Sequence, residues 1–374
     1  MWKEIELGNV ANVLSGFAFK ANEFSDRGTP VLKIKNVAAG YLRMNDVQYY
    51  PFEISERGKK FIIKGGDILI AMTGSHAHQP SSMVGKSCRY NLESISLLNQ
   101  RVGKIYSRDK SKLDEDFLFY FLKQDYIPFE LATSAGGSAN QANISPDQIK
   151  QLSISLPPLP EQKLISETLS SLDDKIDLLH RQNKTLEALA ETLFRQWFVE
   201  EETESKILGE LASVSTGKGL KRNEFLEDGE FSILGANGEI GRTNKFLTDE
   251  KLILTGRVGT LGEIKISEGK VWISDNVLII KPVKEKYFYP IYFSLKQIDF
   301  ENLNVGSTQP LVTQTDLKTI QISFSKEEVL IDYANQCNEL FKKIKSNAKQ
   351  IKTLTQLRDT LLPKLMSGEV RINN

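Results

Sequence analysis

The sequence has few of the residues that mark disulfide-rich, membrane-spanning or metal-binding proteins. It contains two cysteines, Cys88 and Cys337, and three histidines in 374 residues. The cysteines lie far apart without the spacing of a disulfide framework. No apolar run approaches the roughly 20 residues that cross a bilayer, and residues 1–6 lack the pattern of a signal peptide. We therefore exclude a disulfide-stapled fold and expect a protein of the reducing cytoplasm.

Neither sign of charge is in excess. Lys and Arg number 48, as do Asp and Glu, so the formal net charge is zero. This balance argues weakly against nucleic acid, because DNA-binding domains usually carry a basic excess. The acidity is concentrated in residues 161–205, which hold 5 basic and 11 acidic side chains, against 19 and 16 in residues 1–160. The rest of the chain can therefore still present basic surfaces.

Motifs for adenine methylation, nucleotide binding and metal binding are missing or incomplete. The Pro-Pro pair at residues 157–158 is flanked by leucines, where adenine methylation needs a polar Asn or Asp and an aromatic. Residues 85–87 resemble the end of a phosphate-binding loop, but its first glycine would fall at Pro80. The histidines of residues 76–78 and Cys88 lack metal-ligand spacing, which favours a polar loop. We expect a non-catalytic chain that binds no cofactor or metal.

The chain does contain a long internal duplication. Two segments return at an offset of 201, residues 8–16 as 209–217 and residues 22–24 as 223–225. Later the offset is 168, and residues 154–156 match residues 322–324. A period this long indicates two whole globular units instead of a stacked array of short repeats. Two similar units in one chain suit a target that itself has two parts.

Heptad repeats predict two long helices, each of about 35 residues or roughly 50 Å. The first follows a proline-rich connector at residues 156–160, and the second lies 168 residues later. The predicted coiled-coil core comprises Ile165, Leu169, Leu172, Ile176, Leu179, Asn183, Leu186 and Leu193 in the first helix, and Leu340, Ile344, Asn347, Ile351, Leu354, Leu361 and Leu365 in the second.

Two equivalent helices most simply pair antiparallel about a pseudo-twofold axis. That pairing places Asn183 opposite Asn347 and Trp197 opposite Tyr333. A buried Asn is tolerated opposite another Asn and penalises slipped registers. We therefore predict an α/β protein in which two globular domains are separated by two long helices that form an antiparallel coiled coil, with a pseudo-twofold internal repeat.

This organisation resembles the specificity subunits of Type I restriction-modification systems. The most specific segments are residues 156–162, where three prolines precede Glu161 and Gln162, and residues 357–370; the glycine-rich residues 66–74 and 255–262 are also similar. The second half departs from the first at residues 324–328, where the proline-rich entry is missing, and its domain is 33 residues shorter. The resemblance divides the chain into target-recognition domain 1 (residues 1–158), the first spacer helix (159–203), target-recognition domain 2 (204–325), and the second spacer helix with a C-terminal tail (326–374).

The resemblance implies a non-catalytic subunit that recognises a bipartite sequence in double-stranded DNA, one half-site per domain, across a spacer set by the helices. Two methyltransferase subunits, which would bind S-adenosylmethionine, would dock on the helices, and restriction subunits could join them. Two alternatives stay open: the specificity subunit of a related two-component, Type IIB-like system, and a coiled-coil scaffold for protein interactions. Only DNA recognition predicts a steep loss of DNA affinity with salt.

Candidate DNA-binding residues lie in polar loops and at basic positions. The loop at residues 73–82 follows a buried strand, from which its side chains could reach base edges. In the second half Arg257 lies among glycines that permit close approach to a guanine or a phosphate. Each candidate could equally be an ordinary surface residue. The full set is Lys20, Arg43, Thr73, Ser75, His76, His78, Lys86, Arg101, Lys218, Lys221, Arg222, Arg242, Lys245, Arg257 and Thr260.

Two other features have open roles. The loops at residues 133–141 and 306–309 occur in both halves, so we expect them to share a common task instead of recognising different bases. An acidic face of the first helix would point away from DNA and either meet a partner subunit or stay solvated. Its members are Asp173, Asp174, Asp177, Glu187 and Glu191.

Overall fold

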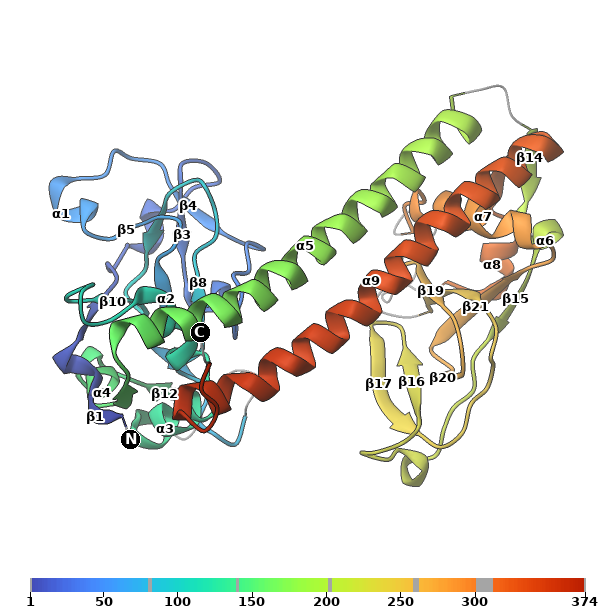
Figure 1. Ribbon diagram of the computed structural model, residues 1–374. Coiled ribbons are helices and arrows are strands. Elements are labelled where there is room, and N and C mark those ends of the chain that lie inside the picture. Colours follow the sequence, from blue (N-terminus) through green and yellow to red (C-terminus); the bar gives the residue numbers. More distant parts are fainter. Residues whose placement is uncertain are drawn as a thin grey trace. The chain divides into compact units, whose positions relative to one another are not determined.

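The computed structural model describes residues 2–79, 83–138, 141–200, 204–257, 262–300 and 312–372. The chain forms two compact units (Figure 1). Unit 1 combines Met1–Leu178 with Gln350–Asn374, and unit 2 is Leu179–Lys349. The predicted boundaries treat the two helices as segments of their own, whereas the compact units divide each helix between them. The reason is that each end of a helix packs on the core of the unit that it enters.

Four small sheets are present in the described part of unit 1. The first pairs β1 (Lys3–Glu6) with β13 (Ser153–Leu156). The second has the order β2 (Ala11–Ser15), β10 (Val102–Ser107), β6 (Ile68–Ala71), β8 (Ser87–Arg89). The third has the order β4 (Gln48–Tyr50), β3 (Thr29–Leu32), β9 (Ser96–Leu98), β5 (Ile62–Ile63). The fourth has the order β11 (Gly136–Ser138), β12 (Gln141–Asn143), β7 (Thr73–Gly74).

Short helices complete unit 1, and side chains cap the first turns of α1, α2 and α4. They are α1 (Glu56–Lys59), α2 (Glu115–Leu122), α3 (Tyr126–Ser134) and α4 (Pro146–Lys150), with 3-10 turns η1 (Leu7–Asn9), η2 (Ala21–Glu23) and η3 (Ile34–Asn36). The Asp114 carboxylate accepts a hydrogen bond from the amide of Phe117 at 2.9 Å, and Ser145 caps α4 in the same way. Such caps satisfy amides that have no partner within the helix.

Unit 2 repeats this arrangement. It contains the pair β14 (Glu204–Ile207) with β22 (Gln321–Phe324), and the sheet β15 (Ala212–Thr216), β21 (Val277–Pro282), β18 (Leu252–Gly256), β19 (Lys265–Ser267). A further sheet has the order β17 (Gly238–Thr243), β16 (Phe231–Gly235), β20 (Val271–Ile273). The shorter helical elements are α6 (Leu208–Leu211), α7 (Phe288–Lys296), α8 (Gln314–Lys318), η5 (Arg222–Glu224) and η6 (Glu285–Tyr287).

Two of the sheets have the same strand order in both units. The order β2-β10-β6-β8 returns as β15-β21-β18-β19, and β1-β13 returns as β14-β22. Even the parallel pairing of β3 with β9 has its counterpart in β16 with β20, within sheets whose other pairings are antiparallel. The internal repeat predicted from the sequence is thus present in the topology.

Each unit has its own hydrophobic core. In unit 1 the aromatic helix α2 packs under β6 and β10 together with Ile165 and Leu169 of one long helix and Leu365 of the other. In unit 2 the helix α7 occupies the equivalent place, with Phe194, Phe198 and Tyr333 from the long helices. The strands β6 and β18 are buried at every position, which explains their nearly continuous apolar sequence.

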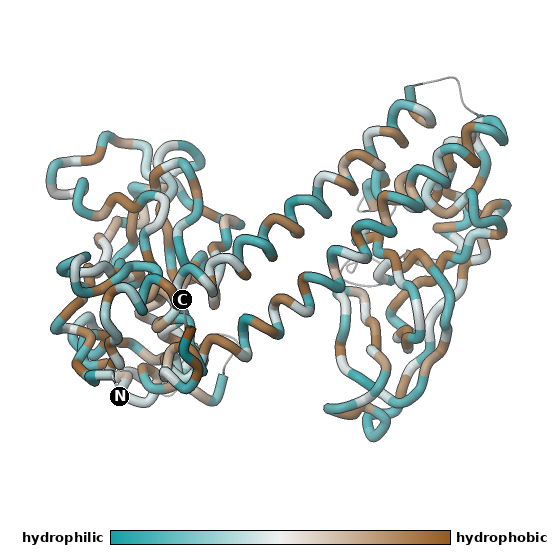
Figure 2. The backbone as a smooth tube through the Cα atoms, viewed as in Figure 1, coloured by the Kyte–Doolittle hydropathy of each residue, from teal (hydrophilic) through white to brown (hydrophobic). Residues whose placement is uncertain are grey.

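The two long helices are α5 (Leu159–Phe198) and α9 (Glu327–Ser367). Apolar residues recur along both of them, separated by hydrophilic ones (Figure 2). Their mutual contacts run antiparallel: Asp173 meets Arg358, Asn183 meets Asn347, and the Ala190 carbonyl accepts from the Tyr333 hydroxyl at 3.0 Å. No helix in the described ranges combines the length and apolarity needed to cross a membrane.

Two predicted contacts between the helices are confirmed. The Asn347 side-chain amide donates to the Asn183 carbonyl oxygen at 2.8 Å, and the rings of Trp197 and Tyr333 lie 6.1 Å apart, edge to face. All the predicted core residues are buried or half-buried. The heptad pattern missed Phe194 and Phe198, which are fully buried because this end of α5 also enters the core of unit 2.

The proline-rich entry to α5 has a structural role. Gln162 is fully buried, and its amide nitrogen donates to the carbonyls of Lys112 and Pro157 at 2.9 Å each, while its oxygen accepts from the Asp114 amide. The neighbouring Glu161 carboxylate accepts from the Trp2 indole at 3.1 Å. Gln162 thereby satisfies backbone groups that would otherwise be buried without partners.

Candidate DNA interface

The loop that follows β6 was predicted to contact DNA, and its hydroxyls are instead engaged inside unit 1. The Thr73 hydroxyl donates to the Asn143 side-chain oxygen at 2.8 Å, and the Ser75 hydroxyl donates to the Gln79 carbonyl at 2.7 Å. Both side chains are only 5% exposed. The prediction that Thr73 and Ser75 contact bases is therefore not supported, because buried and bonded hydroxyls cannot reach a base edge.

The two histidines of the same loop lie at its surface. Their rings stack at 6.2 Å with an interplanar angle of 16°, and His78 is the more exposed of the two. An exposed imidazole such as that of His78 can donate or accept hydrogen bonds at base edges or phosphates. His76 and His78 therefore remain candidates for DNA contact.

A second group of candidates gathers around Tyr41, which the sequence analysis did not select. The Arg43 guanidinium donates twice to the Tyr41 hydroxyl, at 2.8 and 3.2 Å. Partial burial lowers the pKa of Lys86, and the positive charge of Arg43 lowers it further. The fold thus brings Arg43 and Lys86 together, although they are 43 positions apart. An exposed tyrosine two residues before an arginine was the available sequence signal.

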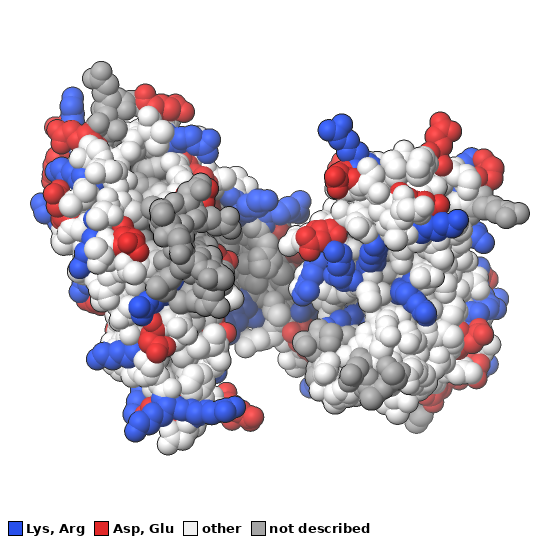
Figure 3. Space-filling model, turned by 180° about the vertical axis from the view of Figure 1, so that it is seen from behind, with Lys and Arg blue, Asp and Glu red and all other residues white. Residues whose placement is uncertain are grey.

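Lys20 and Arg101 are both exposed in unit 1. The Arg101 carbonyl accepts from the Met72 amide at 2.9 Å, which places Arg101 beside the start of the predicted DNA-binding loop. Over the face in Figure 3, Lys and Arg side chains are distributed across both units and interspersed with acidic ones.

In unit 2, Arg257 directly follows the buried strand β18. Its amide donates to the Asn276 carbonyl at 2.9 Å, and its carbonyl accepts from the Val312 amide. Both backbone polar groups of Arg257 are therefore hydrogen-bonded. Its side chain is half-buried. The neighbouring candidate Thr260 lies outside the described residues. The other candidates follow the duplicated strand β15 in the chain, and all of them are exposed: Lys218, Lys221 and Arg222.

Arg242 and Lys245 have partners within the chain. The Arg242 guanidinium donates to the carbonyls of Gly229 and Glu230 at 2.7 and 2.9 Å and to the Glu239 carboxylate at 3.2 Å. It braces a turn within unit 2, and its assignment to DNA stays a prediction. Lys245 forms an ion pair with Glu224. That pair is exposed and therefore weak, so it does not by itself exclude a phosphate contact.

The loop shared by the two halves acts as a support in unit 1. Strands β11 and β12 form a hairpin, and β12 pairs with β7 so that Ala142 lies opposite Gly74 and Asn143 opposite Thr73. This hairpin holds the start of the predicted DNA-binding loop. Its counterpart at residues 306–309 lies outside the described residues.

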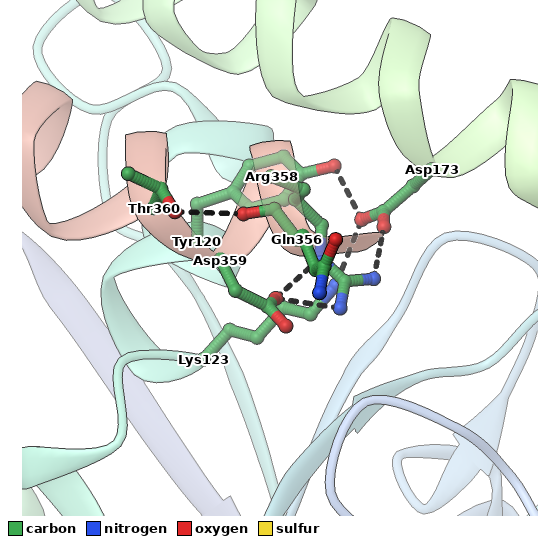
Figure 4. Close-up of polar contacts among 7 residues, drawn as sticks. All are labelled: Tyr120, Lys123, Asp173, Gln356, Arg358, Asp359 and Thr360. Carbon is green, nitrogen blue, oxygen red and sulfur yellow. Dashed lines mark hydrogen bonds and ion pairs between the residues drawn. The ribbon is translucent and has the colours of Figure 1, made fainter. Parts of the chain in front are cut away.

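A polar cluster fastens α2 to both long helices in unit 1, as Figure 4 shows. One oxygen of the Asp173 carboxylate accepts from the Tyr120 hydroxyl at 2.9 Å and from the Lys123 ammonium at 2.8 Å. The other accepts from the Arg358 guanidinium at 2.8 Å. Arg358 also donates to the carboxylate of Asp359, at 2.7 and 2.9 Å.

Electrostatics explain the ionisation of this cluster. Burial alone would raise the pKa of Asp173, but the adjacent charge of Lys123 and the hydrogen bond from Arg358 hold it below the usual range. Burial lowers the pKa of Lys123. Asp173 is therefore a carboxylate committed to contacts within the chain.

The predicted acidic face is accordingly corrected at two positions. Asp173 is bound within unit 1, and in unit 2 the Glu187 carboxylate accepts from the Tyr292 hydroxyl at 3.0 Å and from Lys296 at 2.7 Å. Since both carboxylates anchor a short aromatic helix, α2 or α7, they are not free to meet a partner subunit. Asp174 and Asp177 stay exposed, and Glu191 is half-buried.

The cysteines are buried one in each unit, and burial raises the pKa of both thiols to about 12. Across the described ranges, no three His, Cys, Asp or Glu side chains are grouped so that they could hold a metal ion.

These features define a duplicated binding protein, in which two units of one design share two long antiparallel helices and present different polar surfaces. The chain matches the family model described as the Type I restriction modification DNA specificity domain over residues 1–188 and again over residues 200–355. It therefore belongs to that family, and it is a Type I specificity subunit. The two matches coincide with the two halves of the internal repeat.

Individual relatives agree with this assignment. The chain is 24% identical over 405 residues to the putative type I restriction enzyme MjaX specificity subunit of Methanocaldococcus jannaschii, covering 99% of this chain and 94% of the relative. It is 30% identical over 190 residues to the MjaVIII specificity subunit of the same organism, where the match spans 50% of this chain and 43% of the relative. The crystal structure of the S subunit from M. genitalium shares the fold, with a TM-score of 0.64, 20% identity and coverage of 98% and 96%.

Proposed function

We propose that this chain recognises a bipartite sequence in double-stranded DNA, with one half-site bound by each unit. The observation that carries the proposal is a common scaffold with different surface residues. The strand orders of two sheets match between the units, yet Phe17 at the end of β2 corresponds to Lys218 at the end of β15, and both are exposed. Two scaffolds of one design with different exposed residues suit two half-sites of different sequence.

The long helices would fix the spacing between the half-sites. They belong to both units, and the hydrogen bond between Asn183 and Asn347 opposes a shift of one helix along the other. A rod of roughly 50 Å spans about 15 base pairs at 3.4 Å per step. That length would set two recognition surfaces on successive turns of the major groove.

The chemistry would come from partner subunits. We propose that two methyltransferase subunits, which bind S-adenosylmethionine, dock on the exposed faces of α5 and α9, and that restriction subunits join through them. This chain itself would contribute recognition without catalysis. The exposed residues Asp174 and Asp177 are available for such contacts, whereas Asp173 and Glu187 are not.

Methylation sequencing of DNA from cells that express this chain with its methyltransferase tests the proposal. We expect a modified adenine in each half of one bipartite motif with a constant spacer. If the complex assembles but methylates no defined sequence, the chain is a coiled-coil scaffold and the proposal is wrong. Cleavage and methylation activities in a single partner polypeptide would instead identify a two-component system of the Type IIB kind.

A further inference from the structure

One short turn recurs in the two units with the same hydrogen bonds. After β2, the Gly16 amide donates to the Val102 carbonyl at 3.0 Å; after β15, the Gly217 amide donates to the Val277 carbonyl at 3.1 Å. Both glycines are required, because a Cβ at either would lie 2.2 to 2.3 Å from a backbone oxygen. The chain then enters η2 in unit 1 and η5 in unit 2.

The residue before each of these 3-10 turns is a lysine whose backbone is fixed in the same way. The Lys20 amide donates to the Glu23 carboxylate at 2.8 Å, and the Lys221 amide donates to the Glu224 carboxylate at 3.1 Å. The following Phe24 and Phe225 are also matched. The turn is thus held by glycine, by glutamate and by backbone bonds.

The ammonium groups of the two lysines are not bound by the turn, although the charge of Lys221 acts on the nearby Glu224 carboxylate and helps to lower its pKa. Lys20 and Lys221 are both exposed, and within the described residues neither ammonium makes a hydrogen bond or an ion pair shorter than 4 Å. The hydrogen bonds that fix each turn use only the backbone amide at this position. Both lysines therefore present an exposed positive charge from an equivalent, fixed backbone position.

A feature common to both units cannot distinguish two different half-sites. It suits the component of DNA that is the same in every sequence, which is the phosphate backbone. Neighbouring positions differ between the units, as Phe17 and Lys218 show, and are the ones free to differ with the sequence.

We infer that Lys20 and Lys221 form a matched pair of phosphate contacts, one in each unit, which position the units on DNA without contributing to sequence choice. The inference rests on the proposed function. Other cations lie near each turn in the sequence, Lys33 and Lys35 in unit 1 and Lys218 and Arg222 in unit 2.

The test uses the complex with the methyltransferase and two duplexes, one with the methylated motif and one with both half-sites scrambled. Each contact to a phosphate contributes about 0.9 to the slope of log affinity against log salt, which is about fivefold in affinity at 0.15 M salt. We expect K20A and K221A each to lower affinity about fivefold for both duplexes and to reduce the salt slope by about 0.9. The double variant should lose about 25-fold, with an unchanged methylation motif.

The control is K3A, which removes an exposed lysine from β1 of unit 1 and should leave both affinity and slope unchanged. K20R and K221R should restore binding, because arginine keeps the charge. The inference is overturned if K20A and K221A bind as wild type does, or if either variant changes the recognised sequence of one half-site. If the wild-type complex itself fails to prefer its motif over the scrambled duplex, the proposed function has failed instead.

Discussion

Replacement of Asp173 by alanine should destabilise unit 1 selectively. The carboxylate receives three hydrogen bonds, two of them from the cations Lys123 and Arg358. Removing one partner of a buried ion pair costs about 3–5 kcal/mol, because the remaining charges lose their compensation. Here the side chains of Asp173, Lys123 and Arg358 keep 22%, 15% and 17% of their exposure. Because water can solvate the partly exposed charges that remain, we expect the free energy of unfolding to fall by about 3 kcal/mol.

Urea denaturation followed by Trp2 fluorescence measures this effect. Trp2 lies in unit 1, and the other tryptophans, Trp197 and Trp272, lie in unit 2, so a W197F/W272F background isolates the signal. A loss of about 3 kcal/mol should lower the urea midpoint by about 1 M or more.

The matched control is D174A, which removes the adjacent, exposed carboxylate. Its free energy of unfolding should stay within about 0.5 kcal/mol of the parent. Equal midpoints for D173A and D174A would refute the conclusion that the Asp173 cluster fastens unit 1 to the long helices.

Four further predictions follow from the same contacts. E187A in unit 2 should cost only about 1 kcal/mol, because the Glu187–Lys296 pair is 38% and 30% exposed; Trp272 fluorescence in a W2F/W197F background reports it. Alanine replacement of Asn183 and of Asn347 should cost less together than the sum of the single losses, by about 0.5 kcal/mol or more, and a double-mutant cycle in urea measures that coupling. Because the pKa of Asp173 is lowered in the folded state, its contribution to the free energy of unfolding is complete above pH about 4 and is lost as the pH falls through the folded pKa. The free energy of unfolding of D173A should therefore fall less steeply with acid than that of the parent protein. R257A should reduce methylation of the recognised motif. R242A should instead lower the melting temperature of unit 2, because the Arg242 guanidinium braces a turn there. A folded R242A protein with unchanged stability would contradict this bracing role.

The features that sequence predicted well depend on local periodicity or on repetition. The heptad pattern located α5 and α9, and the coincidence of Asn183 with Asn347 gave the register that the structure has. The duplicated segments identified two units of one design because a copied fold keeps its glycines and its buried strands.

The features that sequence missed depend on contacts between distant positions. Thr73 was chosen as an exposed hydroxyl, but its partner is Asn143, 70 residues away. Asp173 was placed on an acidic face that would meet a partner subunit or stay solvated, and its partners Tyr120 and Arg358 are 53 and 185 residues away. Arg358 is a charged residue at a position of the heptad pattern that is otherwise apolar. This was the sign in the sequence that a buried anion, Asp173, lies opposite.

The discontinuous make-up of unit 1 bears on the order in which the newly made chain can fold. Unit 1 starts before unit 2 along the chain, yet Leu362, Leu365 and Met366 of its core are translated only after all of unit 2. Unit 2 is one unbroken segment, Leu179–Lys349, and is completely synthesised first. Domains usually complete their folding from the N-terminus onward during synthesis. In this chain the later half should reach its final structure first, while the earlier half stays open, and at risk of aggregation, until the final helix turns emerge.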